Sequence, residues 1–213
     1  MVDPEFVRRR TTEAALPDGT RIRLRPIVPE DKALLVAGFE RMSPESRYRR
    51  FMAPLEELTP ELLVRLTEVD YRNHFAWLAL ALDDPLTPGA GVARYVRLPD
   101  EPEVAEAAVT VIDDYHGRGI GTLLLQALGA VALENGIRRF RSYAVEANVP
   151  LRELMHNLGA HVEHDSPGLV RVEVDLPARA EELKGTPLYE VLRAVARGEG
   201  PRFLPAGLDA ARS

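Results

Sequence analysis

The hydrophobic and polar positions of this chain change period at a glycine-rich turn. Over residues 105–112 two sets of side chains alternate, one of them wholly apolar, as in a half-buried strand. From Gly119 onward apolar residues recur three and four positions apart, which predicts an amphipathic helix ending near residues 135–136. The turn contains Gly117, Gly119 and Gly121, which lack a Cβ and permit positive φ. The pattern therefore predicts a strand, a tight loop and a helix in direct succession.

The same two periods predict further elements on both sides of this unit. Strands are expected at residues 20–25, 74–82, 91–97, 138–145, 160–163 and 169–176, and helices at residues 30–40, 44–51, 60–68 and 148–159. Residues 1–15 are expected to be loose. Pro177 marks a change in composition, after which a helical stripe of leucine and valine precedes a weakly held tail. We expect an N-terminal extension at residues 1–17, one domain at residues 18–176, and a C-terminal helix and flexible tail at residues 177–213.

Composition narrows the class of protein. A chain of 213 residues with 46% hydrophobic and 28% charged residues is typical of one globular domain. Its longest strongly apolar run is far shorter than the roughly 20 residues of a membrane span, and no signal peptide is evident, so we expect a cytoplasmic protein without membrane contact. A net charge of −6 argues against nucleic-acid binding. The absence of cysteine excludes a cysteine nucleophile and thiolate metal ligands.

The glycine turn has the features of a phosphate site. A strand that turns through glycines into a helix directs several backbone N–H groups, and the positive end of the helix dipole, at one point. Two common phosphate loops are excluded, because no Gly-Lys-Ser/Thr follows and the third glycine comes too early for a dinucleotide fingerprint. The alternative interpretation is that the glycines only make a tight turn.

The run His-Gly-Arg-Gly-Ile-Gly at residues 116–121 resembles the acyl-CoA loop of the GNAT acetyltransferases, Gln/Arg-x-x-Gly-x-Gly/Ala. His116 replaces the usual Gln or Arg but keeps a side-chain donor. The resemblance implies acetyl-CoA as cofactor, with the loop amides binding its diphosphate and Arg118 adding a nearby cation. The residues implied in cofactor binding are Val111, Ile112, His116, Gly117, Arg118, Gly119, Ile120, Gly121, Thr122 and Asn148.

Further blocks extend the resemblance. Residues 25–35 are similar to the first strand and helix of a GNAT domain. Asn148 opens a predicted helix, and in GNAT proteins the asparagine at that place commonly contacts the pantetheine arm or the phosphates. The resemblance implies an α/β (α+β) GNAT fold, with a mixed, mostly antiparallel central sheet of about six to seven strands, flanking helices and a splayed acyl-CoA cleft. Residues 18–20, 43–51, 58–61, 69–71 and 147–151 resemble the bacterial protein lysine acetyltransferases that act on acyl-CoA synthetases.

Acetylation of a lysine requires a base. A free lysine has a pKa of about 10.4 and is almost wholly protonated at neutral pH, so its ammonium must lose a proton, directly or through water, before it attacks a thioester. Glu106 matches by position the general base of the lysine acetyltransferases. Glu103 is a weaker candidate for the base. The alternative interpretation is that Glu106 is a strand glutamate that faces solvent and has no catalytic role. The family's oxyanion donor is a backbone N–H late in this strand, which places it at Val111 or Ile112.

Six further positions carry weaker expectations. Met155 stands where many GNAT enzymes have a tyrosine acid, so the thiolate, with a pKa of about 8.5, is expected to leave unassisted. Tyr143 and His156 could replace that acid, although core packing and a helix surface are the expected roles. Trp77 is expected to be buried in a strand. His161 and His164 should lie on opposite strand faces with no convincing third ligand, so we expect no metal site.

The arginines at residues 47–50 are expected to form a solvated face, with an acidic-substrate site or a site for the CoA 3′-phosphate as the alternative. Three functions remain open. The leading one is an acetyl-CoA-dependent protein lysine N-acetyltransferase, with an acyl-CoA synthetase as a candidate acceptor. The others are an acetyltransferase for a small amine and a catalytically silent acyl-CoA-binding module. The oligomeric state stays open.

Overall fold

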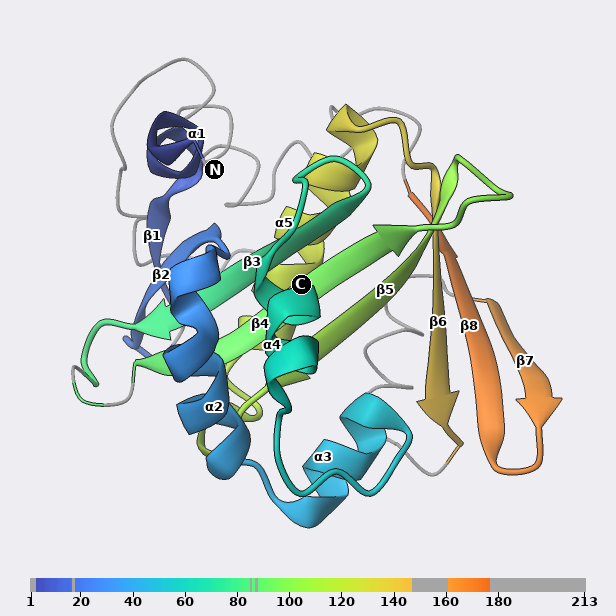
Figure 1. The fold of residues 1–213 in the computed structure, drawn as a ribbon, viewed down its shortest axis with the longest axis horizontal. Helices are drawn as coiled ribbons and strands as arrows, with labels where there is room; N and C mark the ends of the chain where they lie inside the picture. Colours follow the sequence, from blue (N-terminus) through green and yellow to red (C-terminus); the bar gives the residue numbers. More distant parts are fainter. Residues whose placement is uncertain (1–2, 17, 85, 87, 147–160, 177–213) are drawn as a thin grey trace, which may run out of the picture.

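One twisted sheet of eight strands organises the part of the chain that the computed structural model describes, residues 3–16, 18–84, 86, 88–146 and 161–176 (Figure 1). Its strand order is β1-β2-β3-β4-β5-β6-β8-β7. The strands are β1 (Thr12–Ala15), β2 (Arg21–Pro26), β3 (His74–Ala81), β4 (Gly89–Arg97), β5 (Val104–Val111), β6 (Arg139–Val145), β7 (His161–Ser166) and β8 (Leu169–Asp175).

Helices cover both faces of the sheet. In Figure 1, α2 (Lys32–Glu40), α3 (Pro44–Phe51) and α4 (Pro60–Thr67) lie in front of it, and α5 (Ile120–Glu134) lies behind. The sequence starts α3 and α4 in the same way. Ser43 and Thr59 cap them with side-chain oxygens that accept backbone N–H bonds, and a proline takes the first helical position in both. None of the described helices has both the length and the apolar composition needed to cross a bilayer.

The sheet opens between its two central parallel strands. Neighbouring strands are antiparallel except β5 and β6, which pair over only three positions, from Val104 opposite Arg139 to Glu106 opposite Arg141. Beyond Glu106 the two strands diverge, as Figure 1 shows. The hydroxyl of Ser142 on β6 donates to the carbonyl of Ala107 at 2.6 Å and closes the apex of the opening. The mixed, mostly antiparallel sheet and its splay are confirmed.

The prediction of a loose segment at residues 1–15 is wrong for most of it. Residues Pro4–Arg10 form the helix α1, capped by Asp3, and β1 pairs with β2 as the edge strand of the sheet. Phe6 packs against Tyr71 with ring centroids 4.9 Å apart. A strand of four residues is too short to show an alternation, and β2 supplies its hydrogen-bond partners. This strand raises the count from the six or seven expected to eight.

Two predicted regions lie outside the described residues. They are the helix expected at residues 148–159 and the helix and tail expected at residues 177–213. The remaining predicted elements are confirmed with small shifts of their ends.

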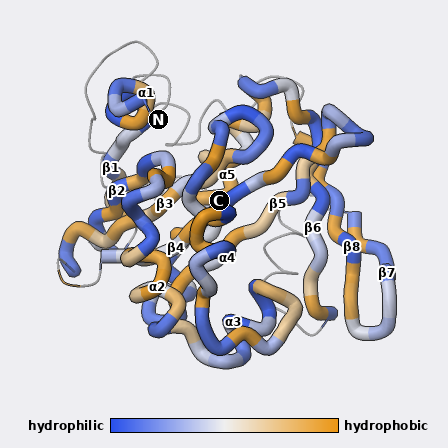
Figure 2. The backbone as a smooth tube through the Cα atoms, viewed as in Figure 1, coloured by the Kyte–Doolittle hydropathy of each residue, from blue (hydrophilic) through white to orange (hydrophobic). Residues whose placement is uncertain are grey.

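The core lies between α5 and the central strands. Phe75, Trp77 and Tyr95 on β3 and β4 are almost fully buried, and Leu124 and Leu128 of α5 are 0% exposed. Trp77 is therefore a core residue, as predicted. In Figure 2 hydrophobic segments follow β3 and β4, whereas α3 is mostly hydrophilic. The apolar stripe of α5 holds the helix against the back of the sheet, which fixes the position of its N-terminus.

Gly91 on β4 is required by close packing. A Cβ there would lie 2.7 Å from the carbonyl oxygen of Thr110 and 3.0 Å from Cδ1 of Leu124. We expect Gly91→Ala to lower the free energy of unfolding by about 2–3 kcal/mol, because the paired backbone of β5 cannot move aside. Gly89→Ala is the matched control, since its Cβ would lie 3.7 Å from the nearest atom. Urea unfolding measures both, and equal losses would contradict this explanation.

Candidate active site

The loop between β5 and α5 is open to a ligand. Gly117 and Gly119 adopt φ of 74° and 90°, a region that side chains rarely occupy. Both are exposed, and a Cβ built on either would have no atom within 4 Å. The glycines therefore make the turn that sequence reasoning expected and also leave free space above the main chain.

The first backbone N–H groups of α5 have no acceptor within the helix. Its first helical hydrogen bond runs from the Leu123 N–H to the Gly119 carbonyl at 3.0 Å. The N–H groups of Ile120, Gly121 and Thr122 precede that bond, and helices leave such groups without an intrahelical acceptor. Gly119 supplies no side-chain cap. Backbone donors, the positive helix end and open space fit the diphosphate of coenzyme A.

The side chains of His116 and Arg118, on either side of Gly117, are held at the edges of the loop. Nε2 of His116 lies 2.9 Å from the carbonyl oxygen of Val111, which ties the loop to the end of β5. The Arg118 guanidinium lies 3.7 Å from the Asp18 carboxylate and 5.2 Å from the centre of the Tyr115 ring. His116 and Arg118 are both exposed beside the glycines. Arg118 thus keeps a cation next to the loop, as expected.

The hydrogen bonds of β5 show which amides face the opening. The Ile112 N–H donates to Ala90 on β4 at 3.0 Å. Antiparallel pairs alternate between bonded and non-bonded positions, so the Val111 and Val109 N–H groups point away from β4, toward the splay. The structure thus engages Ile112 with β4 and directs Val111 into the opening. Sequence reasoning missed Val109, because only the register reveals its direction.

Glu106 lies where the sheet begins to open. It is exposed, and Arg141 faces it across the last paired position of β5 and β6. Arg141 is engaged elsewhere, by Glu101 at 2.7 Å and Glu173 at 2.8 Å. Its guanidinium therefore already has two carboxylate partners other than Glu106. Glu103, the weaker candidate, precedes β5, where its carbonyl accepts from two backbone amides at the far end of the strand.

The spacing along β5 constrains how Glu106 can act. A strand advances about 3.3 Å per residue, so Val109 is about 10 Å and Val111 about 16 Å from Glu106 along the backbone. A carboxylate side chain does not span either distance to an atom held at those amides. A base at Glu106 would therefore reach a group held at those amides through water.

The end of β5 also holds α3. The Ser43 N–H donates to the Asp113 carboxylate at 2.9 Å, and the Ser46 hydroxyl donates to it at 2.6 Å. Burial raises the pKa of Asp113, but these hydrogen bonds outweigh burial and hold the pKa below its ordinary value. Hydrogen bonds thus join the turn that follows β5 to the start of α3.

Arg47 has a structural role. Its guanidinium donates to the carbonyls of Phe39, Glu40 and Met42 at the end of α2 and stacks 4.3 Å from the centre of the Phe39 ring. This arrangement differs from both the solvated face and the anion site considered for it. Positive charge at a helix C-terminus complements the helix dipole.

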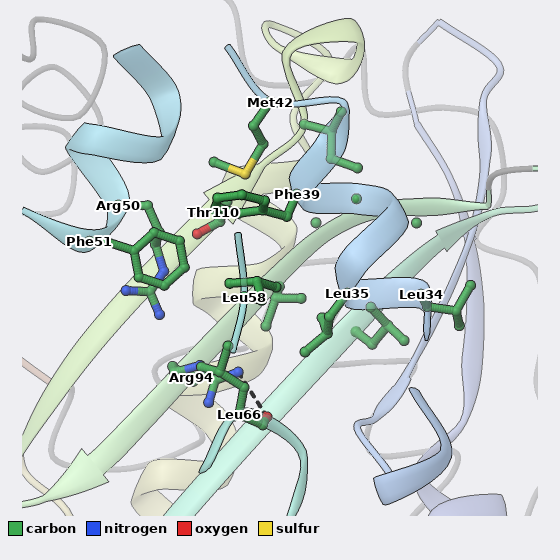
Figure 3. A pocket seen from close by; sticks show the side chains of 16 residues that line it. Leu34, Leu35, Phe39, Met42, Arg50, Phe51, Leu58, Leu66, Arg94 and Thr110 are labelled. Atoms are coloured by element: carbon green, nitrogen blue, oxygen red, sulfur yellow. Dashed lines mark hydrogen bonds between the residues drawn. The ribbon is translucent and has the colours of Figure 1, made fainter. Parts of the chain in front are cut away.

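A cavity of about 70 Å³ lies between α2, α3, α4 and the front of the sheet. Most of its wall is apolar, formed by leucines, Phe39, Phe51 and Ile112, and Figure 3 shows Arg50 and Arg94 at one side of it. Arg94 on β4 is only 7% exposed. Sequence reasoning missed it, although a lone arginine in the apolar run of residues 92–96 was the available signal.

The partners of Arg94 carry no negative charge. One guanidinium nitrogen donates to the Leu66 carbonyl at 3.0 Å, as Figure 3 marks, and another lies 3.1 Å from Nε2 of His74. Burial, with the charge of Arg50 adding to it, lowers the pKa of Arg94 to about 9, so it remains protonated at neutral pH. Burial also lowers the pKa of Arg50, and the charge of Glu106 opposes that effect.

His74 makes stability depend on pH. Burial, followed by the charge of Arg94, lowers the pKa of His74 to about 4. The unfolded imidazole titrates near its reference value of about 6.5, so the unfolded state binds more protons between these values. We expect His74 to contribute about 2 kcal/mol above pH 6.5 that is lost as the pH falls toward 4. Urea unfolding from pH 7 to pH 4 should show a smaller decline for His74→Gln than for the wild type; parallel declines would contradict the assignment.

The remaining candidate residues have mixed outcomes. Tyr143 is 41% exposed, so the prediction that it packs in the core is wrong. It lies on β6 two positions beyond Arg141, on the same face of the sheet. The side chain is exposed because β6 has already diverged from β5 at this position. His161 and His164 are exposed on β7, and within the described ranges no three His, Asp or Glu residues are grouped to hold a metal. Asn148, Met155 and His156 lie outside the described residues.

Known proteins share this sequence and fold. The chain is 40% identical over 154 residues to acetyltransferase Pat of Mycolicibacterium smegmatis, which is 72% of this chain and 45% of that protein. It is 35% identical over 145 residues to acetyltransferase PA5475 of Pseudomonas aeruginosa, covering 68% of this chain and 77% of the relative. The chain thus spans less than half the length of the mycobacterial relative.

Solved structures agree with these relatives. The GNAT domain of S. lividans PAT superposes with a TM-score of 0.73 at 30% identity, covering 83% of this chain and 100% of that one. A cAMP-binding acyltransferase from Mycobacterium smegmatis gives a TM-score of 0.63 at 33% identity, over 91% of this chain and 55% of that chain. A model of the acetyltransferase (GNAT) domain family matches residues 21–161. The chain therefore belongs to the GNAT acetyltransferase family.

Proposed function

We propose that this protein transfers an acetyl group from acetyl-CoA to the side-chain amine of a protein lysine, with an acyl-CoA synthetase as the acceptor. GNAT acetyltransferases use acetyl-CoA. The observation that carries the proposal is the opening of the sheet immediately after Glu106, with the glycine loop and the start of α5 next to the other end of β5. The resemblance to proteins named Pat supports a protein acceptor.

Each proposed residue has a task in the transfer. The amides of residues 117–122 bind the diphosphate, with Arg118 beside them. The Val111 or Val109 N–H donates to the carbonyl oxygen as negative charge develops on it. Glu106, through water, accepts a proton from the lysine ammonium, and the freed nitrogen forms a bond to the carbonyl carbon. Acetyl-CoA supplies the activated thioester; its C–S bond breaks, the newly bonded nitrogen loses its second proton to water, and the thiolate takes up a proton from water or from the exposed Tyr143 hydroxyl.

An exposed acceptor site is consistent with a protein substrate. Glu106 is exposed at the splay, where a lysine on the surface of another protein can reach it. The cavity in front of the sheet does not favour a small amine, because its two guanidinium groups repel an ammonium. The silent-module alternative predicts binding of acyl-CoA without turnover.

A labelling experiment tests the proposal. The full chain is incubated with radiolabelled acetyl-CoA and either a purified bacterial acyl-CoA synthetase or a cell lysate. We expect label in a protein band that depends on Glu106. Label confined to the small-molecule fraction would favour the small-amine function, and binding of acetyl-CoA without any transfer would favour the silent module.

A further inference from the structure

The cavity in front of the sheet has a charge that its known partners do not balance. Among the described residues, Arg94 contacts a carbonyl and a neutral imidazole, and its buried Nε has no hydrogen-bond partner. Arg50 adds a second guanidinium to the wall, and the carboxylate whose charge acts on it is Glu106, exposed where the splay begins. Buried cations are costly unless an anion or hydrogen-bond acceptors compensate them. The cavity is therefore suited to a ligand with a negative end.

The position of the cavity connects it with the acyl end of the proposed substrate. Thr110 of β5 and Ile112, the residue after that strand, form part of its wall, and they flank Val111, whose N–H points into the splay. In the register of β4 and β5, Arg94 lies opposite Ala108. Ile112 is four residues further along, so it lies at the end of the wall that is away from Arg94. An acyl chain whose thioester carbonyl is bound at the Val111 amide, and which turns to the front of the sheet, would run along this wall toward the two arginines.

The size of the cavity limits that chain. A water needs about 10–15 Å³ of such volume, so 70 Å³ holds about five non-hydrogen atoms. Two methylenes and a carboxylate, the part of a succinyl group beyond its thioester carbonyl, are about five such atoms. The leucines and Phe39 can pack on the methylenes, and a planar guanidinium can bind a carboxylate with two hydrogen bonds.

We propose that the cavity between α2, α3, α4 and the sheet accepts the acyl chain of a short dicarboxylic acyl-CoA, of the succinyl class, with its terminal carboxylate bound by Arg94 and Arg50. The inference deepens the proposed function and rests on its acyl-CoA binding. The transfer is the same as for acetyl: the amine nitrogen bonds to the thioester carbon, the C–S bond breaks, the amine loses a proton and the thiolate gains one. The terminal carboxylate does not change.

Calorimetry with three donors tests this assignment. Acetyl-CoA, butyryl-CoA and succinyl-CoA are titrated into the wild type, Arg94→Met and Arg50→Met, and transfer to the acceptor is measured with each donor. We expect the wild type to bind succinyl-CoA at least about tenfold more tightly than butyryl-CoA. Either methionine variant should abolish that preference and leave acetyl-CoA binding unchanged. Arg94→Lys should keep part of it, and Arg23→Met, which removes an exposed arginine of β2, should keep all of it.

The outcomes separate the two proposals. If no acyl-CoA binds, the proposed function fails. If acetyl-CoA binds but the wild type prefers butyryl-CoA, or if the preference for succinyl-CoA persists in both methionine variants, the assignment of this cavity is overturned. Binding of free succinate that depends on Arg94, without a preference among the donors, would also overturn it, because the cavity would then serve a free acid. Since Arg50 is only half-buried, Arg50→Met gives the answer even if Arg94→Met does not fold.

Discussion

Glu106→Gln is expected to lower turnover at neutral pH by about 10²- to 10⁴-fold, the range typical of general-base catalysis. Glutamine keeps the size of the side chain but cannot accept the proton of a lysine ammonium. Because the carboxylate is exposed at the start of the splay, the fold and the binding of acetyl-CoA should not change. Release of free thiol during acetylation measures turnover, and calorimetry measures the dissociation constant for acetyl-CoA.

Two comparisons make this test specific. Glu103→Gln, before the same strand, should retain nearly full turnover. The deficit of Glu106→Gln should shrink as the pH approaches the lysine pKa of about 10.4, because the acceptor then loses its proton without help. Undiminished acetylation by Glu106→Gln at pH 7 would exclude Glu106 as the base.

Thr122→Asp is expected to weaken acyl-CoA binding by about a hundredfold. Thr122 is exposed in the first turn of α5, next to the amides that we propose bind the diphosphate. A carboxylate there repels the two phosphates across a few ångströms. The same charge is favourable at a helix N-terminus, so thermal stability should stay equal or rise slightly. Calorimetric titration with coenzyme A and thermal unfolding measure the two effects separately.

Thr122→Asn is the matched control for charge. It has the shape of aspartate without the charge, and its affinity for coenzyme A should remain within about threefold of the wild type. A similar loss in both variants would indicate a steric cause. Unchanged affinity in Thr122→Asp would show that the diphosphate does not lie at this end of α5.

The elements that sequence reasoning predicted are those whose signals are local. Ser43 and Thr59 cap α3 and α4 through bonds to their own helices, and the apolar stripe of α5 contains nine buried residues. Such periodicities and caps depend on neighbours within a few positions. β1 has no such signal, since its bonds are made by β2 across a turn.

The site divides in the same way. The glycine loop and the start of α5 were predicted because turn and helix are consecutive in the chain. The structural role of Arg47 was not predicted, because the carbonyls to which it donates come from the end of the preceding helix. Tyr143 was expected in the core, but its exposure follows from the divergence of β6 from β5, which no local pattern records.

The sequence by itself determined the order of the elements, the phosphate-type loop at residues 116–121 and the position of Glu106 in the strand before it, since each depends on a periodicity or a motif of adjacent residues. Only the tertiary structure decided that the sheet opens after Glu106, that Val109 and Val111 turn their amides into the opening while Ile112 bonds to β4, and that Arg50 and Arg94 meet in one cavity. These features depend on register and on contacts between strands and helices far apart in the chain. Pairing of that kind is set by the packing of the whole core.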